Sequence, residues 1–205
     1  MIKLIAFDLD GVLIDSKEIH FNALNLALAE VGDTYIISRN EQDTVFEGLT
    51  TNVKLDILTK TKGLPRDLHE EIWQKKQEYS ATLFESTSKD EDLVNLFRYI
   101  KSRGIKIAVA SNSIRKTLDT CLKTLGVYGY VDYSLSNEDV KLPKPDPQVY
   151  NWCMDYLMVG PEDTVIFEDS EIGLRAAIAT GAKVERVLNR KDVYFDRIDR
   201  IIHEA

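Results

Sequence analysis

The sequence predicts an α/β fold in which a parallel β-sheet is covered by helices on both faces and interrupted by a helical insertion. Short apolar runs alternate with amphipathic helical segments from about residue 90 to residue 188, and the helical segments end at glycines. Strands and helices in strict alternation with short connections are typical of parallel sheets built from right-handed crossovers. The stretch from about residue 16 to residue 84 has helical periodicity and no convincing strand, which predicts the insertion.

The first strand is expected at Lys3 to Phe7, at the centre of the sheet. This run is continuously apolar rather than alternating, as is typical of a strand that is covered on both faces. The insertion follows at once, because Asp15-Ser16-Lys17-Glu18 has the form of a capping box that opens a helix running to Val31 and ending at Gly32. Further helical pieces are expected at about 40–46, 51–61 and 65–84.

Beyond the insertion the alternation is regular. The expected elements are a helix over 90–103, a strand over 105–110, a helix over 113–126, a weaker strand over 130–135, a helix over 146–159, a strand over 164–167, a helix over 170–180 and a strand over 182–188. The prediction is a Rossmann-like three-layer core made of residues 1–15 and 85–205, with an inserted α-helical cap domain over 16–84.

Composition excludes several classes of function. The 205 residues include 26 basic and 34 acidic side chains, a formal charge of −8, with no clustered Lys/Arg stripe, so nucleic acids and acidic membranes are not expected partners. Apolar runs are far shorter than the roughly 20 residues of a membrane helix, and no signal peptide or anchor is expected. The prediction is a cytoplasmic monomer whose two cysteines, Cys121 and Cys153, are buried thiols.

Polar residues follow three of the predicted strands at the point where each strand ends. These segments are Asp8-Leu9-Asp10-Gly11, Ser111-Asn112-Ser113 and Glu168-Asp169-Ser170. In open α/β sheets ligands bind beyond the carboxyl ends of the strands, so these segments are expected to form one site.

The acidic members of that site predict a cation. A D-x-D pattern alone is weak, and Asp90-Glu91-Asp92 has the character of a solvated helix start. Asp8 and Asp10, however, end a strand without a cationic neighbour in sequence, and two close carboxylates repel by about 4 kcal/mol at an effective dielectric constant of 20. Adding Glu168 and Asp169 increases the repulsion. Oxygen-only ligands favour Mg²⁺. The alternative is that these carboxylates only cap the helices and turns that follow.

Four segments in chain order resemble the motifs of the haloacid dehalogenase superfamily, in particular its phosphatase and β-phosphoglucomutase-like branch. They are Phe7-Asp8-Leu9-Asp10-Gly11-Val12-Leu13-Ile14-Asp15-Ser16, Val109-Ala110-Ser111-Asn112-Ser113, Lys144-Pro145-Asp146-Pro147, and Ile166-Phe167-Glu168-Asp169-Ser170 with Gly173. The resemblance covers essentially the whole chain, and the insertion lies where that family has its helical cap.

This resemblance implies roles for the acidic residues. Asp8 would be the nucleophile that forms an aspartyl-phosphate, and Asp10 would be the general acid and then the general base. Mg²⁺ would be held by Asp8, the main-chain carbonyl of Asp10 and Asp169, with Glu168 beside it. An aspartate at position 10, which dehalogenase members lack, favours phosphoryl transfer over cleavage of a carbon–halogen bond.

The other two motifs would bind phosphate. Ser111 and the backbone N–H of Asn112, at a helix start, can bind phosphate oxygens. Lys144 would supply positive charge, in a turn that Pro143, Pro145 and Pro147 stiffen. The alternative for Lys144 is a surface lysine in a proline-rich turn.

The insertion is expected to determine substrate specificity. Its candidate substrate loop is Glu47-Gly48-Leu49-Thr50-Thr51. Gly48 would permit the turn, and Thr50 or Thr51 would cap the next helix, a role that alone suffices to explain the threonines. Sugar-phosphate mutases of this branch carry basic residues in this loop to hold a second phosphate. In this sequence Thr51 and Glu47 stand at those places, which argues against a bisphosphate intermediate. Lys54 or Lys75 could partly substitute for the missing basic residues.

His20 is a further substrate-binding candidate. It lies one turn into the first cap helix, and in mutase-like relatives a histidine at that place couples cap closure to catalysis. The alternative is an ordinary position on the helix surface.

The function expected from the sequence is therefore a Mg²⁺-dependent phosphatase that acts on a small phosphomonoester, a sugar phosphate or similar metabolite, through an aspartyl-phosphate. One alternative is a β-phosphoglucomutase-like sugar phosphomutase. Another, of a different class, is a non-catalytic protein that binds a phosphate ligand.

Overall fold

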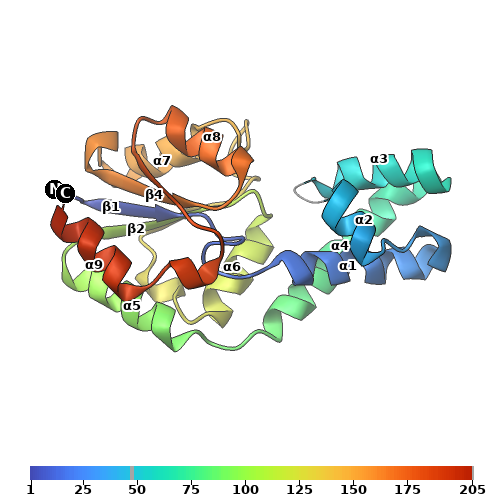
Figure 1. The fold of residues 1–205 in the computed structure, drawn as a ribbon, viewed down its shortest axis with the longest axis horizontal. Coiled ribbons are helices and arrows are strands. Elements are labelled where there is room, and N and C mark those ends of the chain that lie inside the picture. The colour runs from blue at the N-terminus through green and yellow to red at the C-terminus, as the bar shows by residue number, and fades with distance from the viewer. Residues whose placement is uncertain (47–48, 205) are drawn as a thin grey trace. The chain divides into compact units, whose positions relative to one another are not determined.

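The computed structural model describes residues 1–46 and 49–204, and the chain divides into two compact units (Figure 1). The core unit consists of residues 1–16 and the chain from residue 87 onward, and the helical unit of Lys17–Ser86. Within the described ranges, none of the helices has both the length and the apolar character needed to cross a membrane.

A parallel sheet forms the centre of the core unit, as predicted. Within the described ranges it has five strands in the order β3-β2-β1-β4-β5. Their bounds are β1 Leu4–Phe7, β2 Lys106–Ala110, β3 Tyr133–Leu135, β4 Thr164–Glu168 and β5 Lys183–Arg186. All four residues of β1 are buried, which agrees with its continuous apolar run and its central place.

The register of the three central strands decides which side chains meet at the sheet's carboxyl edge. Phe7 on β1 lies level with Val109 on β2 and with Phe167 on β4. The residues that follow, Asp8 and Glu168, are therefore neighbours across adjacent strands. The strand order reverses on passing from β1 to β4, and such a switch point is where open α/β sheets bind ligands.

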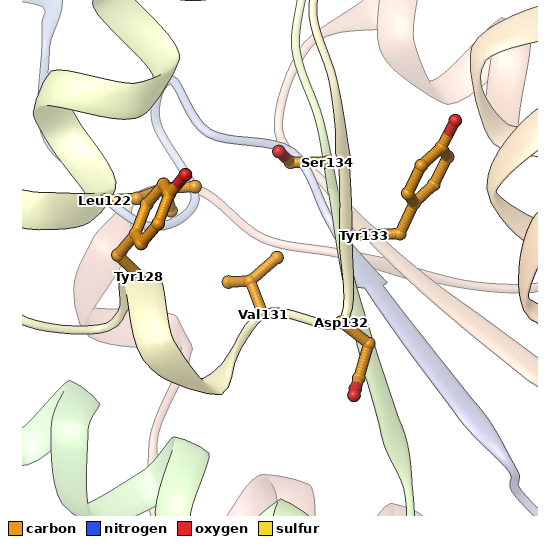
Figure 2. Close-up of a pocket in the computed structure, with 6 residues that line it drawn as sticks. All are labelled: Leu122, Tyr128, Val131, Asp132, Tyr133 and Ser134. Atoms are coloured by element: carbon orange, nitrogen blue, oxygen red, sulfur yellow. The ribbon is translucent and has the colours of Figure 1, made fainter.

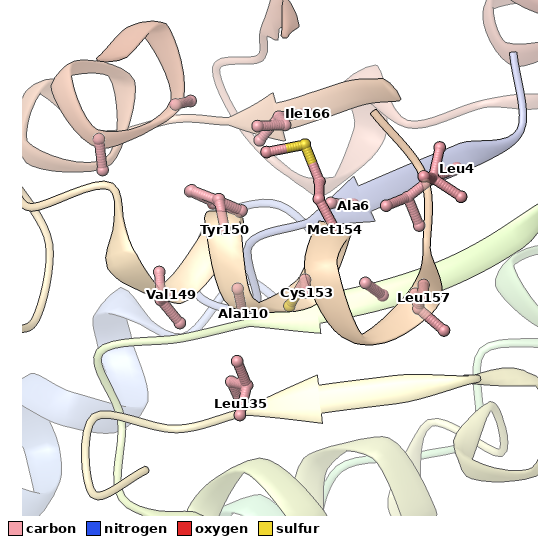
Figure 3. Packing of buried hydrophobic residues seen from close by; sticks show 14 residues of the cluster. Leu4, Ala6, Ala110, Leu135, Val149, Tyr150, Cys153, Met154, Leu157 and Ile166 are labelled. Atoms are coloured by element: carbon pink, nitrogen blue, oxygen red, sulfur yellow. The ribbon is translucent and has the colours of Figure 1, made fainter. Parts of the chain in front are cut away.

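Helices cover both faces of this sheet (Figure 1). One face carries α7 (Gln148–Leu157) and α8 (Glu171–Ala179), and the other carries α5 (Glu91–Ser102), α6 (Arg115–Thr124) and α9 (Phe195–Glu204). Figure 3 shows how α7 packs: Tyr150, Cys153 and Met154 lie in one apolar cluster with Ala6 of β1, Ala110 of β2 and Ile166 of β4. On the opposite face the Phe7 ring stacks on Phe97 of α5 at 5.3 Å between centroids.

The helical unit has its own apolar core. Its elements are α1 (Lys17–Val31), a 3₁₀ turn (Asp33–Tyr35), α2 (Arg39–Glu41), a π-helical turn (Gln42–Phe46), α3 (Thr51–Lys62), a second 3₁₀ turn (Arg66–Leu68) and α4 (His69–Glu85). Leu24 and Leu28 of α1, Leu55 and Leu58 of α3, and Ile72 of α4 are buried together. This burial explains the helical periodicity of the insertion.

Two elements differ from the expectation. The third strand starts at Tyr133 rather than 130, because Tyr128–Tyr130 form a 3₁₀ turn and the side chain of Asp132 takes a ladder position: its carboxylate accepts the N–H of Ile107 at 2.7 Å. The C-terminal helix α9 was not predicted. It buries Ile198 and Ile201, two apolar positions three residues apart that are consistent with a helix.

Candidate active site at the carboxyl edge of the sheet

Three carboxylates converge where β1 and β4 end. Asp8 follows β1, Glu168 is the last residue of β4, and Asp169 comes next. One oxygen from each lies within 4.8 Å of the others, and in the part of the chain that the structure describes this is the one acidic group with such spacing. Asp8 is 6% exposed and Glu168 fully buried. Buried carboxylates this close repel strongly, so the group requires compensating positive charge.

Two glycines allow the carboxylates to approach the backbone. A Cβ atom at Gly11, whose φ is +83°, would lie 2.0 Å from Oδ2 of Asp169. A Cβ atom at Gly173 would lie 2.1 Å from the carboxylate carbon and both oxygens of Glu168. Neither position can accept a side chain unless the carboxylate moves, which accounts for glycine at both places.

Lys144 supplies positive charge from within the site. Its Nζ donates to Oδ1 of Asp8 and to Oε1 of Glu168, both at 2.6 Å, and to the carbonyl oxygen of Ala110 and the hydroxyl of Tyr150, both at 2.8 Å. The side chain is only 3% exposed. Lys144 is therefore a buried member of the site, and the alternative of a surface lysine is wrong.

Burial and the neighbouring charges both shift the pKa values of this cluster. Burial by itself would lower the pKa of Lys144, but the negative charges of Asp8 and Glu168 raise it above its usual value. Burial raises the pKa of Asp8 well above its usual range, with Glu168 and Asp10 adding to the effect and Lys144 opposing it. When the three carboxylates are ionised, one ammonium group leaves an excess of negative charge, which a divalent cation would balance.

Asp10 is oriented by the end of β2. Its Oδ2 accepts hydrogen bonds from the hydroxyl of Ser113 at 2.9 Å and from that of Ser111 at 3.3 Å. Ser111 Oγ also accepts the backbone N–H of Ser113 at 2.9 Å, so the two serines form one compact turn. The carboxylate of Asp10 thus contacts the predicted phosphate-binding motif.

The loop that carries Lys144 is held from two sides. Asn112 donates to the carbonyl oxygen of Lys144 at 3.2 Å and accepts its backbone N–H at 3.1 Å. The side-chain oxygen of Gln148 accepts the backbone N–H groups of Lys141 at 2.7 Å and Leu142 at 3.0 Å. The Lys144-Pro145 peptide bond is cis. The side chain of Asn112 therefore positions the lysine loop, a role not foreseen for it.

The candidates of the helical unit take different positions. His20 lies beside Lys76 on α4, with 3.2 Å between Nδ1 and the ammonium nitrogen. An ammonium group only donates, so Nδ1 is the acceptor in this contact. Lys54 is buried and donates to Gln42 at 3.2 Å. Lys75 is partly exposed and forms ion pairs with two glutamates, Glu30 at 3.7 Å and Glu78 at 3.8 Å.

The predicted substrate loop is described only in part. Thr50 is the N-cap of α3, and its hydroxyl accepts the backbone N–H of Val53. Thr51 is the first residue of that helix. Helix capping thus explains Thr50. Gly48 lies outside the described residues.

Two side chains of interest, Tyr150 and Lys76, were not singled out from the sequence, and Ser113 was placed in the predicted site without a role of its own. Tyr150 contacts both Lys144 and Glu168, Ser113 contacts Asp10, and Lys76 contacts His20. Tyr150 falls among apolar residues of an amphipathic helix, so its pattern favours a core role. Ser113 repeats Ser111 two residues on, and this spacing was the available signal. Nothing in the sequence distinguishes Lys76 from Lys75.

A separate surface hollow lies beside the edge strand β3. Figure 2 shows side chains that line it, which are Leu122, Tyr128, Val131, Asp132, Tyr133 and Ser134. Asp132 is already engaged by Lys101 at 2.5 Å. None of these six residues belongs to the carboxylate cluster, so the hollow is not part of the candidate active site.

Comparison with known proteins agrees with the geometry. A model of the haloacid dehalogenase-like hydrolase family matches residues 5–187. The phosphorylated carbohydrates phosphatase of Thermotoga maritima is 31% identical over 89% of this chain and 82% of its own. The β-phosphoglucomutase of Bacillus subtilis is 25% identical over 87% and 80%. The structure of CbbY from Rhodobacter sphaeroides in complex with phosphate has a TM-score of 0.80 at 24% identity, covering 95% of this chain and 91% of that one.

Proposed function

Because the chain belongs to the haloacid dehalogenase-like hydrolase family, we propose that it is a Mg²⁺-dependent phosphatase that hydrolyses a small phosphomonoester through a phosphorylated Asp8. One observation carries the proposal: Asp8 follows the central strand and lies beside a buried ammonium group and two further carboxylates, with Asp10 two residues on. A carboxylate nucleophile, a positive charge and a second carboxylate are the groups that phosphoryl transfer by covalent catalysis requires.

The donor set fits Mg²⁺. Asp8, Glu168 and Asp169 offer only oxygen ligands, which this hard cation prefers, and no thiol or imidazole belongs to the group. These three residues would hold the ion. When bound, it would supply charge that reduces the repulsion between the carboxylate nucleophile and the phosphate dianion.

The chain's own residues account for both chemical steps. In the first step an oxygen of Asp8 attacks phosphorus, the bond from phosphorus to the ester oxygen breaks, and Asp10 gives its proton to that leaving oxygen. In the second step Asp10 takes a proton from water, whose oxygen attacks the phosphorus of the aspartyl-phosphate. The bond between phosphorus and the Asp8 oxygen breaks, so inorganic phosphate leaves and the carboxylate of Asp8 is regenerated. Ser111 and Ser113 hold the carboxylate of Asp10 in one orientation for both transfers. Lys144 keeps Asp8 in place.

The substrate class rests on the relatives. A relative named for phosphorylated carbohydrates supports a sugar phosphate or similar metabolite. The helical unit would select it, because the phosphoryl-transfer groups described above all belong to the core unit. The buried Lys76 and Lys54, with His20, are its candidate polar groups for the rest of the substrate.

A β-phosphoglucomutase-like phosphomutase is the second candidate, favoured by the match to such an enzyme. Free phosphate released and sugar-phosphate isomer formed should both be measured, with and without a sugar bisphosphate. A phosphatase releases phosphate in both conditions, whereas a mutase forms isomer and depends on the bisphosphate.

The central test uses Asp8→Asn. This variant should fold normally, as judged by circular dichroism, and should lose Mg²⁺-dependent hydrolysis of an aryl phosphate. Mass spectrometry of the wild type trapped during turnover should locate the phosphoryl group on Asp8. If the wild type hydrolyses no member of a broad phosphomonoester panel, the chain is instead a protein that binds a phosphate ligand.

A further inference from the structure

We infer that Tyr150 is a positioning residue that holds Glu168 and Lys144 in the arrangement needed for Mg²⁺ binding. The inference rests on the proposed function and goes beyond it, because neither the motifs nor the chemistry of the two steps uses this side chain. Tyr150 is fully buried in α7, two residues after that helix begins. Its hydroxyl lies 2.8 Å from Nζ of Lys144 and 2.6 Å from Oε1 of Glu168.

The direction of both hydrogen bonds follows from the chemistry of the partners. An ammonium group can only donate, so the hydroxyl oxygen accepts from Lys144. A carboxylate can only accept, so the hydroxyl hydrogen is donated to Glu168. The phenol hydroxyl therefore bridges the ammonium group and the carboxylate.

These hydrogen bonds give the two carboxylate oxygens of Glu168 different partners. Oε1 accepts from both Lys144 and Tyr150, while Oε2 accepts the backbone N–H of Asp169 at a longer 3.2 Å. Oε2 is therefore the oxygen with the greater remaining capacity for a cation. Because the carboxylate also lies close to Gly173 of α8, its rotation is restricted by Tyr150 from α7 and by the backbone of α8.

The hydroxyl of Tyr150 also affects how the three N–H hydrogens of Lys144 are distributed among the neighbouring oxygens. Four oxygens surround the three hydrogens of Lys144: those of Asp8, Glu168, Ala110 and Tyr150. The ammonium nitrogen also lies 4.7 Å from the centre of the Tyr150 ring. Without the hydroxyl, the hydrogens would be shared among the two carboxylates and one carbonyl. Lys144 would then bind Asp8 and Glu168 more tightly and compete with the metal for their oxygens.

The test is Mg²⁺ binding to the full chain by calorimetry, without substrate. Tyr150→Phe keeps the ring and removes the hydroxyl, and its Kd for Mg²⁺ should rise about tenfold, as is typical when a group that orients a metal ligand is lost. Replacement of Tyr150 by 4-aminophenylalanine keeps a donor at the same place, and its Kd should stay within about threefold of the wild type. Tyr156→Phe, an exposed tyrosine on the same helix, is the matched control and should not change Kd.

Three results would overturn the inference. Wild-type binding with an unchanged Kd in Tyr150→Phe would remove the positioning role and leave the proposed function intact. A tenfold loss in the 4-aminophenylalanine variant, where a donor is still present, would do the same even if Tyr150→Phe did not fold. Absence of Mg²⁺ binding by the wild type would instead overturn this inference and the proposed function together.

Discussion

Gly11 and Asp169 are in such close contact that any side chain at position 11 would occupy the space of the carboxylate. A Cβ atom there would lie 2.0 Å from Oδ2 and 2.5 Å from Cγ of Asp169. Gly11 also has a φ of +83°, in the left-handed region. The turn after β1 thus provides both an unusual backbone conformation and the open space in which a candidate metal ligand lies.

We expect Gly11→Ala to abolish Mg²⁺ binding, because Asp169 must move. Gly104→Ala is the matched control, since Gly104 has a φ of +74° and no atom within 4 Å of the added Cβ. Both variants should lose about 1–2 kcal/mol of unfolding free energy from backbone strain, measured in urea with EDTA. Only Gly11→Ala should lose Mg²⁺ affinity in calorimetry. Equal Mg²⁺ affinities in the two variants would contradict this account of Gly11.

Lys144→Met should destabilise the chain by about 3–5 kcal/mol, because it leaves Asp8 and Glu168 buried without their cation. Lys141→Met changes an exposed lysine in the same loop and should shift stability by less than about 0.5 kcal/mol. Urea unfolding in EDTA measures both. Mg²⁺ should restore part of the stability lost in Lys144→Met, since the ion supplies positive charge to the same oxygens. A urea unfolding midpoint equal to that of Lys141→Met would show that the buried ion pair makes no net contribution to stability.

The helical unit should lose stability in acid through Glu41. The backbone N–H of Ser38, then Lys62 and the Ser38 hydroxyl, lower the pKa of Glu41 from 4.5 to about 2. A depressed carboxyl pKa contributes stability that is fully present above pH 4.5 and is lost as the pH falls towards 2. Because the side chain is 32% exposed, solvent screening reduces the contribution to about 1 kcal/mol.

Glu41→Gln tests this pH dependence. The difference in unfolding free energy between the wild type and this variant should be largest above pH 4.5 and shrink steadily below it. Glu78→Gln, an exposed glutamate of the same unit, should show no such trend. A difference that does not change with pH would refute the assignment to Glu41.

Lys76→Met should reduce kcat/KM for a sugar phosphate by about tenfold, equivalent to about 1.4 kcal/mol. The reason is that Lys76 is buried and donates to His20, whereas its neighbour Lys75 is partly exposed and paired with Glu30. Lys75→Met is therefore the matched control and should change kcat/KM less than about twofold. Hydrolysis of an aryl phosphate, which lacks the sugar hydroxyls, should be less affected by Lys76→Met. A larger loss of kcat/KM in Lys75→Met than in Lys76→Met would contradict the assignment of the substrate-binding role to Lys76.

Much of the fold could be predicted from the sequence because its signals are local. The continuous apolar run before Asp8 predicts a buried central strand, and the strict alternation after residue 90 predicts a parallel sheet; both predictions are confirmed. The family and the class of enzyme, a phosphoric monoester hydrolase, are also confirmed. The short strand β3 was predicted, but its start was placed three residues too early, because the carboxylate of Asp132 takes a ladder position and such a contact leaves no periodic pattern in the sequence.

The sequence by itself determined which chemical groups follow each strand, because motif residues are adjacent in the chain and strand ends are readable from apolar runs. Only the tertiary structure decided which of these side chains form hydrogen bonds and ion pairs with one another. Tyr150 comes from a helix that sequence patterning identifies as core, and it reaches Glu168 because α7 packs on the face of the sheet whose apolar cluster also includes Ala6 of β1 and Ile166 of β4. Hydrogen bonds form between atoms within about 3 Å, and the fold brings such atoms together from distant parts of the chain.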